Sequence, residues 1–145
     1  MLRVMPPSLE TPLFRLEPLG PQHNDADYAA WTSSLDHIRS TPGYPDGKWP
    51  DDRSIEDNLR DLRRHAHDSE HRRGFTYTVL DPATADVIGC VYIYPDGEDP
   101  KRASVQSWVR ASRAELDVLL WRAMGAWLET AWPFENVTYD KRQLA

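Results

Sequence analysis

The sequence is short of cysteine, of long apolar runs and of basic residues in excess. Cys90 is the only cysteine, so no disulfide framework holds the 145-residue chain together. No apolar run approaches the roughly 18 residues of a membrane span, and the start, MLRVMPPSLETP, lacks the apolar core of a secretory signal. The net charge of −6 argues against nucleic acid as a partner. We therefore expect a cytoplasmic protein that binds neither a membrane nor nucleic acid.

The length of the chain sets its domain organisation. A chain of 145 residues is long enough to bury one sizeable core, and it predicts a single domain over residues 1–145. Cys90 lies in the apolar run VIGCVYIY. That setting favours a buried, inert thiol over a nucleophile.

Helical periodicity marks three segments. It is strong over residues 52–73 and 112–132, where apolar residues form one stripe, and weaker over 22–34, where Asn24 is a candidate cap. Between two of these helices, residues 35–51 are rich in proline and glycine and predict a long loop. A loop of this length in a small domain is typically functional.

Strand patterns alternate with these helices. Residues 12–19 alternate apolar and polar positions, and FTYTVLD and VIGCVYIYPD predict a β-hairpin, followed by strands in KRASVQSWVR and PFENVTYD. Gly89 inside its strand predicts a bulge or the close approach of another segment. The order β, α, α, β, β, β, α, β predicts an α+β fold, in which helices pack on a mainly antiparallel mixed sheet.

One stretch of the first strong helix resembles a metal site. HDSEH fits the H-x-x-E-H spacing of a class of zinc proteases. At about 100° per residue, His67 and His71 fall nearly opposite the apolar stripe and face water. No third ligand is evident for the open tetrahedral site that catalytic zinc needs. We therefore interpret the motif as a solvated helix face and expect no metal.

The second half of the chain resembles a known family. FTYTVLDPATADVIGCVYI looks like the second and third strands of the GCN5-related N-acetyltransferases (GNAT), and ASVQSWVR like their fourth. The following helix and WPFENVTYD look like the third helix and fifth strand of that family. The resemblance implies an acyl-CoA N-acyltransferase-like fold and the transfer of an acetyl group from acetyl-CoA to an amine.

The resemblance also implies a cofactor site. In the family the fourth strand separates from the fifth, and the pantetheine arm of acetyl-CoA bonds to strand backbone in between, a mode that depends little on side chains. The pyrophosphate lies on backbone amides at the start of the next helix. The implied cofactor-binding residues are the following: Ser107, Trp108 and Val109 through their backbone, Arg110 and Arg113 through their side chains, and Ala114 at the start of the phosphate loop.

The phosphate loop of this chain departs from the family. Ala114 stands where arginine or glutamine begins the loop, and Glu115 and Asp117 stand in place of its glycines. Ser112 and Glu115 have the spacing of a capping box, which would occupy the amides. Losing a cap costs about 1 kcal/mol, whereas each carboxylate at roughly 5 Å from a phosphate repels it by about 1 to 3 kcal/mol. Repulsion is therefore the larger obstacle to acetyl-CoA.

The two arginines of this segment allow two interpretations. Arginine makes bidentate contacts with phosphate, so Arg110 and Arg113 would offset part of the repulsion. Alternatively, both pair on the surface with Glu115, Asp117 or Asp99.

The acceptor side and the catalytic groups follow less directly. Trp31, Tyr44 and Trp49 are candidate substrate-binding residues, because the last two lie in the long loop and loops often carry binding groups. Packing into the core is the alternative, above all for Trp31. The family's general-acid tyrosine follows the fifth strand; nothing in this sequence matches it, and Tyr139 is not given the role. Glu98 and Asp99 are turn acids near the sheet edge, and no general base is assigned.

Two functions remain open at the level of sequence. One is an acetyltransferase that acts on an amine of a small molecule or a protein. The other is a non-catalytic member of the fold, a binding or dimerisation scaffold that has lost acetyl-CoA. In the second case the strand around Val137 would pair with a partner, perhaps most simply a second copy of the chain, because an unprotected edge strand tends to pair.

Overall fold

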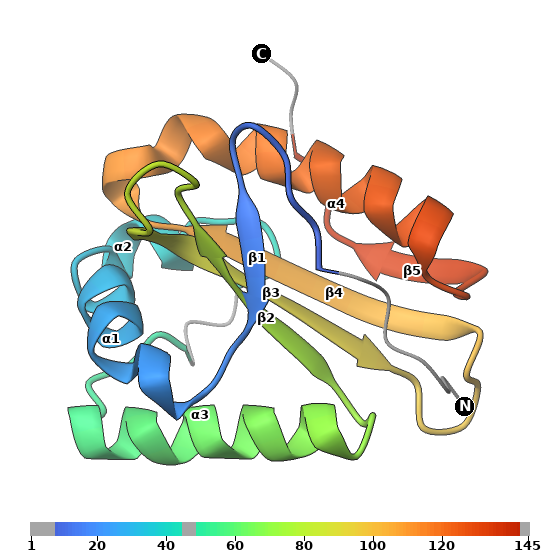
Figure 1. The fold of residues 1–145 in the computed structure, drawn as a ribbon, viewed down its shortest axis with the longest axis horizontal. Coiled ribbons are helices and arrows are strands. Elements are labelled where there is room, and N and C mark those ends of the chain that lie inside the picture. Colours follow the sequence, from blue (N-terminus) through green and yellow to red (C-terminus); the bar gives the residue numbers. More distant parts are fainter. Residues whose placement is uncertain (1–7, 45–48, 143–145) are drawn as a thin grey trace.

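The chain folds into one sheet with helices on both faces, as Figure 1 shows. The structure is a computed structural model that describes residues 8–44 and 49–142. Residues 45–48 of the predicted loop and most of the segment MLRVMPPSLETP lie outside the described residues. The strands are β1 (Arg15–Pro18), β2 (Phe75–Leu80), β3 (Val87–Pro95), β4 (Arg102–Val109) and β5 (Asn136–Tyr139). The helices are η1 (Pro21–His23), α1 (Asn24–Thr32), α2 (Leu35–Arg39), α3 (Ile55–Glu70), η2 (Ala111–Leu116) and α4 (Asp117–Ala131).

The five strands lie side by side in chain order, β1-β2-β3-β4-β5. Neighbours are antiparallel from β1 to β4, and β5 is parallel to β4. The predicted hairpin of β2 and β3 is confirmed, and its link is closed by hydrogen bonds from the backbone of Ala83 and Ala85 to Asp81. This mixed sheet with helices confirms the predicted α+β fold.

Gly89 confirms the close approach predicted for its position. A Cβ atom added to Gly89 would lie 2.0 Å from the carbonyl oxygen of Trp108 on β4. No side chain fits in that space, so glycine lets β3 and β4 pair tightly beside the start of η2.

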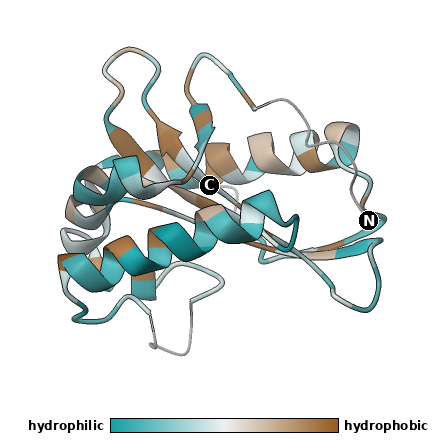
Figure 2. Ribbon diagram, turned by 60° about the horizontal axis from the view of Figure 1, so that its bottom comes forward, coloured by the Kyte–Doolittle hydropathy of each residue, from teal (hydrophilic) through white to brown (hydrophobic). Residues whose placement is uncertain are grey.

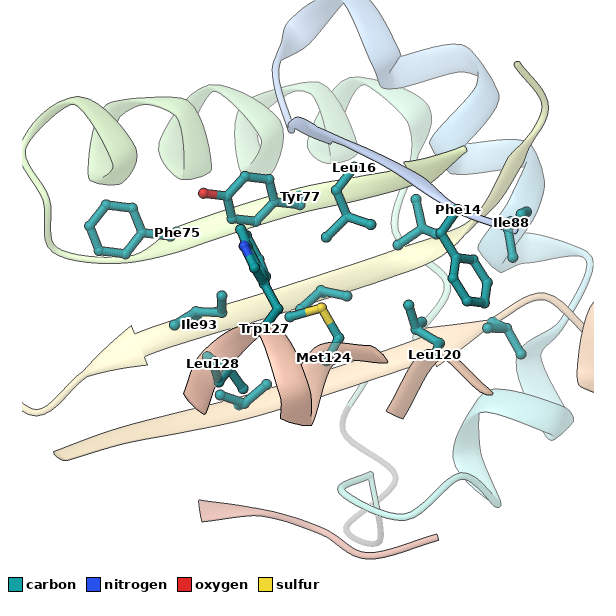
Figure 3. Packing of buried hydrophobic residues seen from close by; sticks show 14 of the residues in the cluster. Phe14, Leu16, Phe75, Tyr77, Ile88, Ile93, Leu120, Met124, Trp127 and Leu128 are labelled. Carbon is teal, nitrogen blue, oxygen red and sulfur yellow. The ribbon is translucent and has the colours of Figure 1, made fainter. Parts of the chain in front are cut away.

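The helix α4 covers one face of the sheet. Its apolar side chains Leu120, Met124, Trp127 and Leu128 pack on strand residues such as Tyr77, as Figure 3 shows. The rings of Tyr77 and Trp127 meet edge to face at 5.4 Å between centroids. The broad apolar face predicted for this helix therefore forms the larger core.

The helices α1, α2 and α3 lie on the opposite face. Their core contains Trp31, Ile38 and Leu62 together with Cys90 and Trp108 from the strands. Figure 2 shows hydrophilic colour along most of α3 and hydrophobic colour along the central strands, as expected for a helix that buries one narrow stripe. Burial raises the pKa of the Cys90 thiol well above its usual range, which suits an inert, protonated side chain.

Helix ends differ from the sequence predictions in three places. The last helix begins at Asp117 instead of Ser112, because η2 precedes it and Arg113 has non-helical φ and ψ angles of −127° and 30°. The described structure shows no side-chain cap at Arg110 or Leu116, so the capping box predicted for Ser112 is wrong. Asn24 does not cap α1 either; its side chain bonds to α3 instead.

Two other ends follow ordinary rules. Ser54 caps α3, since its hydroxyl oxygen accepts a hydrogen bond from the amide of Asp57 at 3.1 Å. The short helix α2 lies within the segment predicted as a loop, because five residues are too few to show helical periodicity.

Candidate functional site

Two regions on either side of β4 carry the residues of interest. The first is the strand divergence, the place where β4 and β5 stop pairing. Parallel pairing runs from Arg102 opposite Asn136 to Val105 opposite Tyr139 and ends there, whereas β4 stays paired with β3 as far as Val109. The end of β4 therefore has one strand neighbour within the described sheet.

Backbone groups at the end of β4 point alternately to its two sides. The amide of Arg110 donates to the carbonyl oxygen of Ile88 on β3 at 2.8 Å, and the carbonyl oxygen of Ser107 faces away from β3. In an antiparallel ladder this alternation turns Ser107 and Val109 toward the strand divergence and Trp108 toward β3. Two of the three predicted backbone positions thus face the place where pantetheine lies in the family.

Arg142 occupies the strand divergence in this structure. Its Nη2 donates to the carbonyl oxygen of Ser107 at 2.9 Å, and its Nε donates to Asp117 Oδ2 at 2.9 Å. A further bond runs from Nη1 to the carbonyl oxygen of Asp140 at 2.8 Å. The side chain is 2% exposed. A buried arginine thus uses the backbone acceptor that an extended ligand would need.

Tyr139 fills the rest of the strand divergence. Its hydroxyl group shares a hydrogen bond of 2.5 Å with Ser107 Oγ, and the guanidinium of Arg142 lies 5.6 Å from the centre of its ring. Burial raises the pKa of Tyr139 to about 12. The phenol is therefore neutral at physiological pH and bridges β5 to β4.

The acids and arginines near η2 are paired differently from either prediction. Arg113 forms an ion pair with Asp81 at 2.7 Å, and the bond to Arg113 lowers the pKa of Asp81. Asp117 pairs with Arg142, while Asp99 lies 3.5 Å from Arg102. None of the three partners expected for Arg113 is its partner among the described residues.

Three further positions of the predicted phosphate loop have clear surroundings. Arg110 donates from Nη1 to the carbonyl oxygen of Val87 at 3.2 Å. Ala114 and Glu115 are exposed, and Glu115 has no ion pair among the described residues. The carboxylate of Glu115 is therefore the uncompensated negative charge at the start of this helical segment.

The second region is the helix-side pocket, a cavity of about 410 Å³ between α1, α3 and the sheet. Its wall includes Asp27, Tyr44, Trp49, Asn58, His65 and Tyr92. A volume of this size is within the ordinary range for small-molecule sites, roughly 300 to 1,000 Å³. The pocket reaches β4 at Gln106, whose side chain donates to the carbonyl oxygen of Gly43 at 2.7 Å.

The three predicted substrate residues have different places here. Tyr44 and Trp49 line the helix-side pocket, with their rings 5.8 Å apart. Trp31 lies behind Trp49 at 5.5 Å and is 1% exposed. Its indole nitrogen donates to Asn58 Oδ1 at 3.1 Å. Trp31 therefore supports the wall of the pocket from the core, which was its alternative interpretation.

A buried carboxylate lines the same pocket. Asp27 is 4% exposed, and one hydrogen bond reaches it among the described residues, from Asn58 Nδ2 at 3.2 Å. The other hydrogen of that amide goes to Asn24 Oδ1 at 2.8 Å, so Asn58 is held in a fixed orientation. Burial is the main cause that raises the pKa of Asp27 to about 6.

The neighbouring histidine is held neutral. His65 Nδ1 lies 2.9 Å from the hydroxyl of Tyr94 and 3.1 Å from that of Thr76. Burial and, to a smaller extent, the charge of Arg64 lower the pKa of His65 to about 4. Its imidazole is therefore an uncharged hydrogen-bonding group of the pocket at physiological pH.

Our sequence analysis did not identify these pocket residues, although a signal for them exists. Asn58 and His65 lie on the same helix stripe as Leu62, and Asp27 lies one turn before Trp31. Polar residues on a stripe that faces a sheet must be paired in the core or line a cavity. That pattern would have pointed to the pocket.

Other expectations concern metals and membranes. His67 and His71 are exposed and stack with each other at 4.1 Å, and no group of three metal-binding side chains occurs in residues 8–44 and 49–142. The H-x-x-E-H match thus lies on the water-facing side of α3. Among the described helices, none combines the length and apolarity needed to cross a membrane.

Comparison with known proteins gives the fold its class. No protein-family model and no curated protein matches the sequence. Many solved structures match the fold. Apo FdhC, a nucleotide-linked sugar GNAT, aligns at a TM-score of 0.68 and 14% identity over 93% of this chain and 72% of its own.

Two further neighbours are acetyltransferases. A ribosomal-protein-alanine acetyltransferase from Vibrio fischeri aligns at a TM-score of 0.65 and 14% identity, over 84% of this chain and 67% of its own. The microcin self-immunity acetyltransferase MccE, solved with acetyl-CoA and AMP, aligns at 0.62 and 13%, over 81% of this chain and 61% of its own. The chain therefore has the fold of the GNAT acetyltransferases and spans between three fifths and three quarters of the length of these three.

Proposed function

We propose that this protein is an N-acetyltransferase that transfers an acetyl group from acetyl-CoA to an amine. The observation that carries the proposal is the separation of β4 from β5 beyond Val105 and Tyr139, in a sheet with the GNAT fold. The helix-side pocket adjoins the same strand on its other face, at Gln106. One strand thus links a place for an extended acyl carrier with a place for an acceptor.

The residues at the strand divergence do not fit a pantetheine arm in this conformation. Ser107 presents its carbonyl oxygen there, but Arg142 already bonds to it, and the hydroxyl of Tyr139 bonds to the side chain of Ser107. Binding of acetyl-CoA therefore requires Arg142 to leave. Breaking a buried ion pair costs on the order of 3 kcal/mol, which weakens the apparent affinity about 100-fold.

The charge at the predicted phosphate position is smaller than the sequence suggested. Asp117 is neutralised by Arg142, so Glu115 is the remaining uncompensated carboxylate of the two among the described residues. One repulsion of about 1 to 3 kcal/mol remains. When Arg142 leaves, Asp117 becomes a second repulsive charge, so the two obstacles are coupled.

A second candidate function is a non-catalytic scaffold. The closed strand divergence favours it, because the groups that would hold acetyl-CoA are bonded to each other. The edge strand β5 is exposed, with Val137 at 38%, and suits pairing with a second copy of the chain. In this alternative the contacts of Arg142 are permanent.

Calorimetric titration with acetyl-CoA separates the two functions. The protein is compared with the double variant Asp117→Asn/Arg142→Ala, which opens the strand divergence without exposing a carboxylate, and with Arg122→Ala as an exposed arginine control. We expect the double variant to bind about 100-fold more tightly than the other two proteins. If neither the protein nor the double variant binds acetyl-CoA at millimolar concentration, the acetyltransferase proposal is wrong and the scaffold is supported.

A further inference from the structure

The polar groups of the helix-side pocket are not all satisfied by one another. Two cationic side chains line it, and both are paired with acids other than Asp27. Arg53 pairs with Asp51 at 2.8 Å and also with Asp61, and Arg64 lies 3.6 Å from Asp61. His65 is neutral. Asp27 thus has no cationic partner among the described residues.

The position of Asp27 makes this lack informative. Its side chain belongs to a residue that is 96% buried, beside β3, where its charge is felt by the thiol of Cys90 and the hydroxyl of Tyr92. A buried carboxylate with one amide donor retains unused acceptor capacity. A partner that supplies N–H donors and a positive charge would satisfy it.

The rest of the wall is aromatic. The rings of Tyr44 and Trp49 lie 5.8 Å apart, and Trp49 lies 6.0 Å from Trp108. Tyr92 lines the same space, and its hydroxyl accepts a hydrogen bond from the indole nitrogen of Trp108 at 3.0 Å. Aromatic faces attract cations and also pack against apolar groups. A carboxylate with aromatic neighbours is the arrangement that recognises an organic ammonium ion.

We propose that the helix-side pocket binds a small primary ammonium compound with an apolar or aromatic body, and that Asp27 is its counter-ion. Asn58 orients the carboxylate, while Tyr44, Trp49 and Tyr92 surround the body of the ligand. Identifying this ligand as the acetyl acceptor rests on the proposed function, whereas its binding does not. The inference selects small-molecule amines over protein amino groups as the substrate class.

The test measures binding without acetyl-CoA. The probe is 2-phenylethylamine, titrated by calorimetry at pH 8 beside the neutral 2-phenylethanol and the anionic phenylacetate. We expect the amine to bind at least 10-fold more tightly than the alcohol and the acid to bind least. Equal binding of amine and alcohol, a preference for phenylacetate, or no binding of the amine at 20 mM (~20 mM being a generous ceiling for a weak small ligand) would overturn the proposal.

Variants locate the effect at one carboxylate. Asp27→Asn keeps the acceptor for Asn58 and should reduce the affinity for the amine to that for the alcohol. Asp25→Asn, an exposed acid on the same helix, should leave both affinities unchanged. The melting temperature of each variant shows that it is folded. Retention of amine selectivity by folded Asp27→Asn would contradict the assignment.

Failure of the inference and failure of the proposed function have different signatures. If the amine binds but is not acetylated in the presence of acetyl-CoA, the pocket assignment holds and the acetyltransferase proposal fails. If an amine that does not depend on Asp27 is acetylated, the acetyltransferase proposal holds and the pocket assignment fails.

Discussion

The two sides of β4 differ in how their polar groups are satisfied. On the β5 side, Arg142 connects Ser107 and Asp117, and the acceptors and donors of that region bond to one another. On the helix side, Asp27 is as deeply buried but has one hydrogen bond among the described residues. Buried polar groups are normally paired. The comparison indicates that the strand divergence is closed by the chain itself, whereas the pocket awaits a ligand.

The largest expected effect is on stability when the closed side is broken. Arg142→Ala leaves the half-buried carboxylate of Asp117 without its cation, and we expect a loss of about 3 kcal/mol in the free energy of unfolding. Asp117→Asn should cost less, because the arginine keeps its bonds to backbone carbonyl oxygens. Urea denaturation of both single variants and of the double variant gives their coupling. Additive losses would show that the two side chains do not act together.

The second effect has the opposite sign and concerns the open side. Burial raises the pKa of Asp27 from 3.8 to about 6, so the native state binds this proton more tightly than the unfolded state. Stability from this group is therefore lost as the pH rises from about 4 to about 6. Replacing Asp27 by asparagine should raise the free energy of unfolding by about 3 kcal/mol at pH 8.

The control for this prediction is pH itself. Near pH 3.5 the carboxyl group is protonated in both states, so Asp27→Asn should unfold at nearly the same urea concentration as the wild-type protein. A destabilised variant at pH 8 would mean that the carboxylate is already compensated within the protein.

The smallest effect sharpens the picture of the pocket. Burial lowers the pKa of His65 from 6.5 to about 4, so its contribution is present above pH 6.5 and is lost as the pH falls toward 4. Over that range Asp27 acts in the opposite direction, and the two largely offset each other. In Asp27→Asn the loss should appear alone, about 2 kcal/mol between pH 6.5 and 4 after a discount for partial exposure of the ring.

This slope has an independent check. Proton NMR should show the His65 ring neutral at pH 5.5 in the wild-type protein. Replacing His65 by glutamine in the Asp27→Asn background should remove the slope. An unchanged slope would assign it to another group.

Local patterns predicted most of the fold. β-Branched and aromatic runs with a short link correctly predicted the hairpin of β2 and β3, and the apolar stripe of residues 52–73 correctly predicted α3. These features depend on neighbours in sequence. The prediction failed at Ser112, where a capping-box spacing suggested a helix start. There the amide of Ala111 bonds to Ser34, a residue far away in sequence.

The candidate site was less predictable for the same reason. Tyr44 and Trp49 were identified because their loop has a distinctive composition. Arg142 was not, because its role depends on a bond to Ser107 across the strand divergence, and no local spacing reports it. Asp27 had a weak signal, a carboxylate on the inner side of α1, that gains meaning only when the cavity is known.

The bond between Ala111 and Ser34 ties the segment entering α4 to the turn between α1 and α2. Its length is 2.8 Å, and Ser34 is buried. A shift of η2 would therefore pull on the turn that leads toward Tyr44. By reciprocity, whatever ligand moves one end alters the affinity of the other by the same factor. Donor and acceptor would then be admitted as a thermodynamically linked pair.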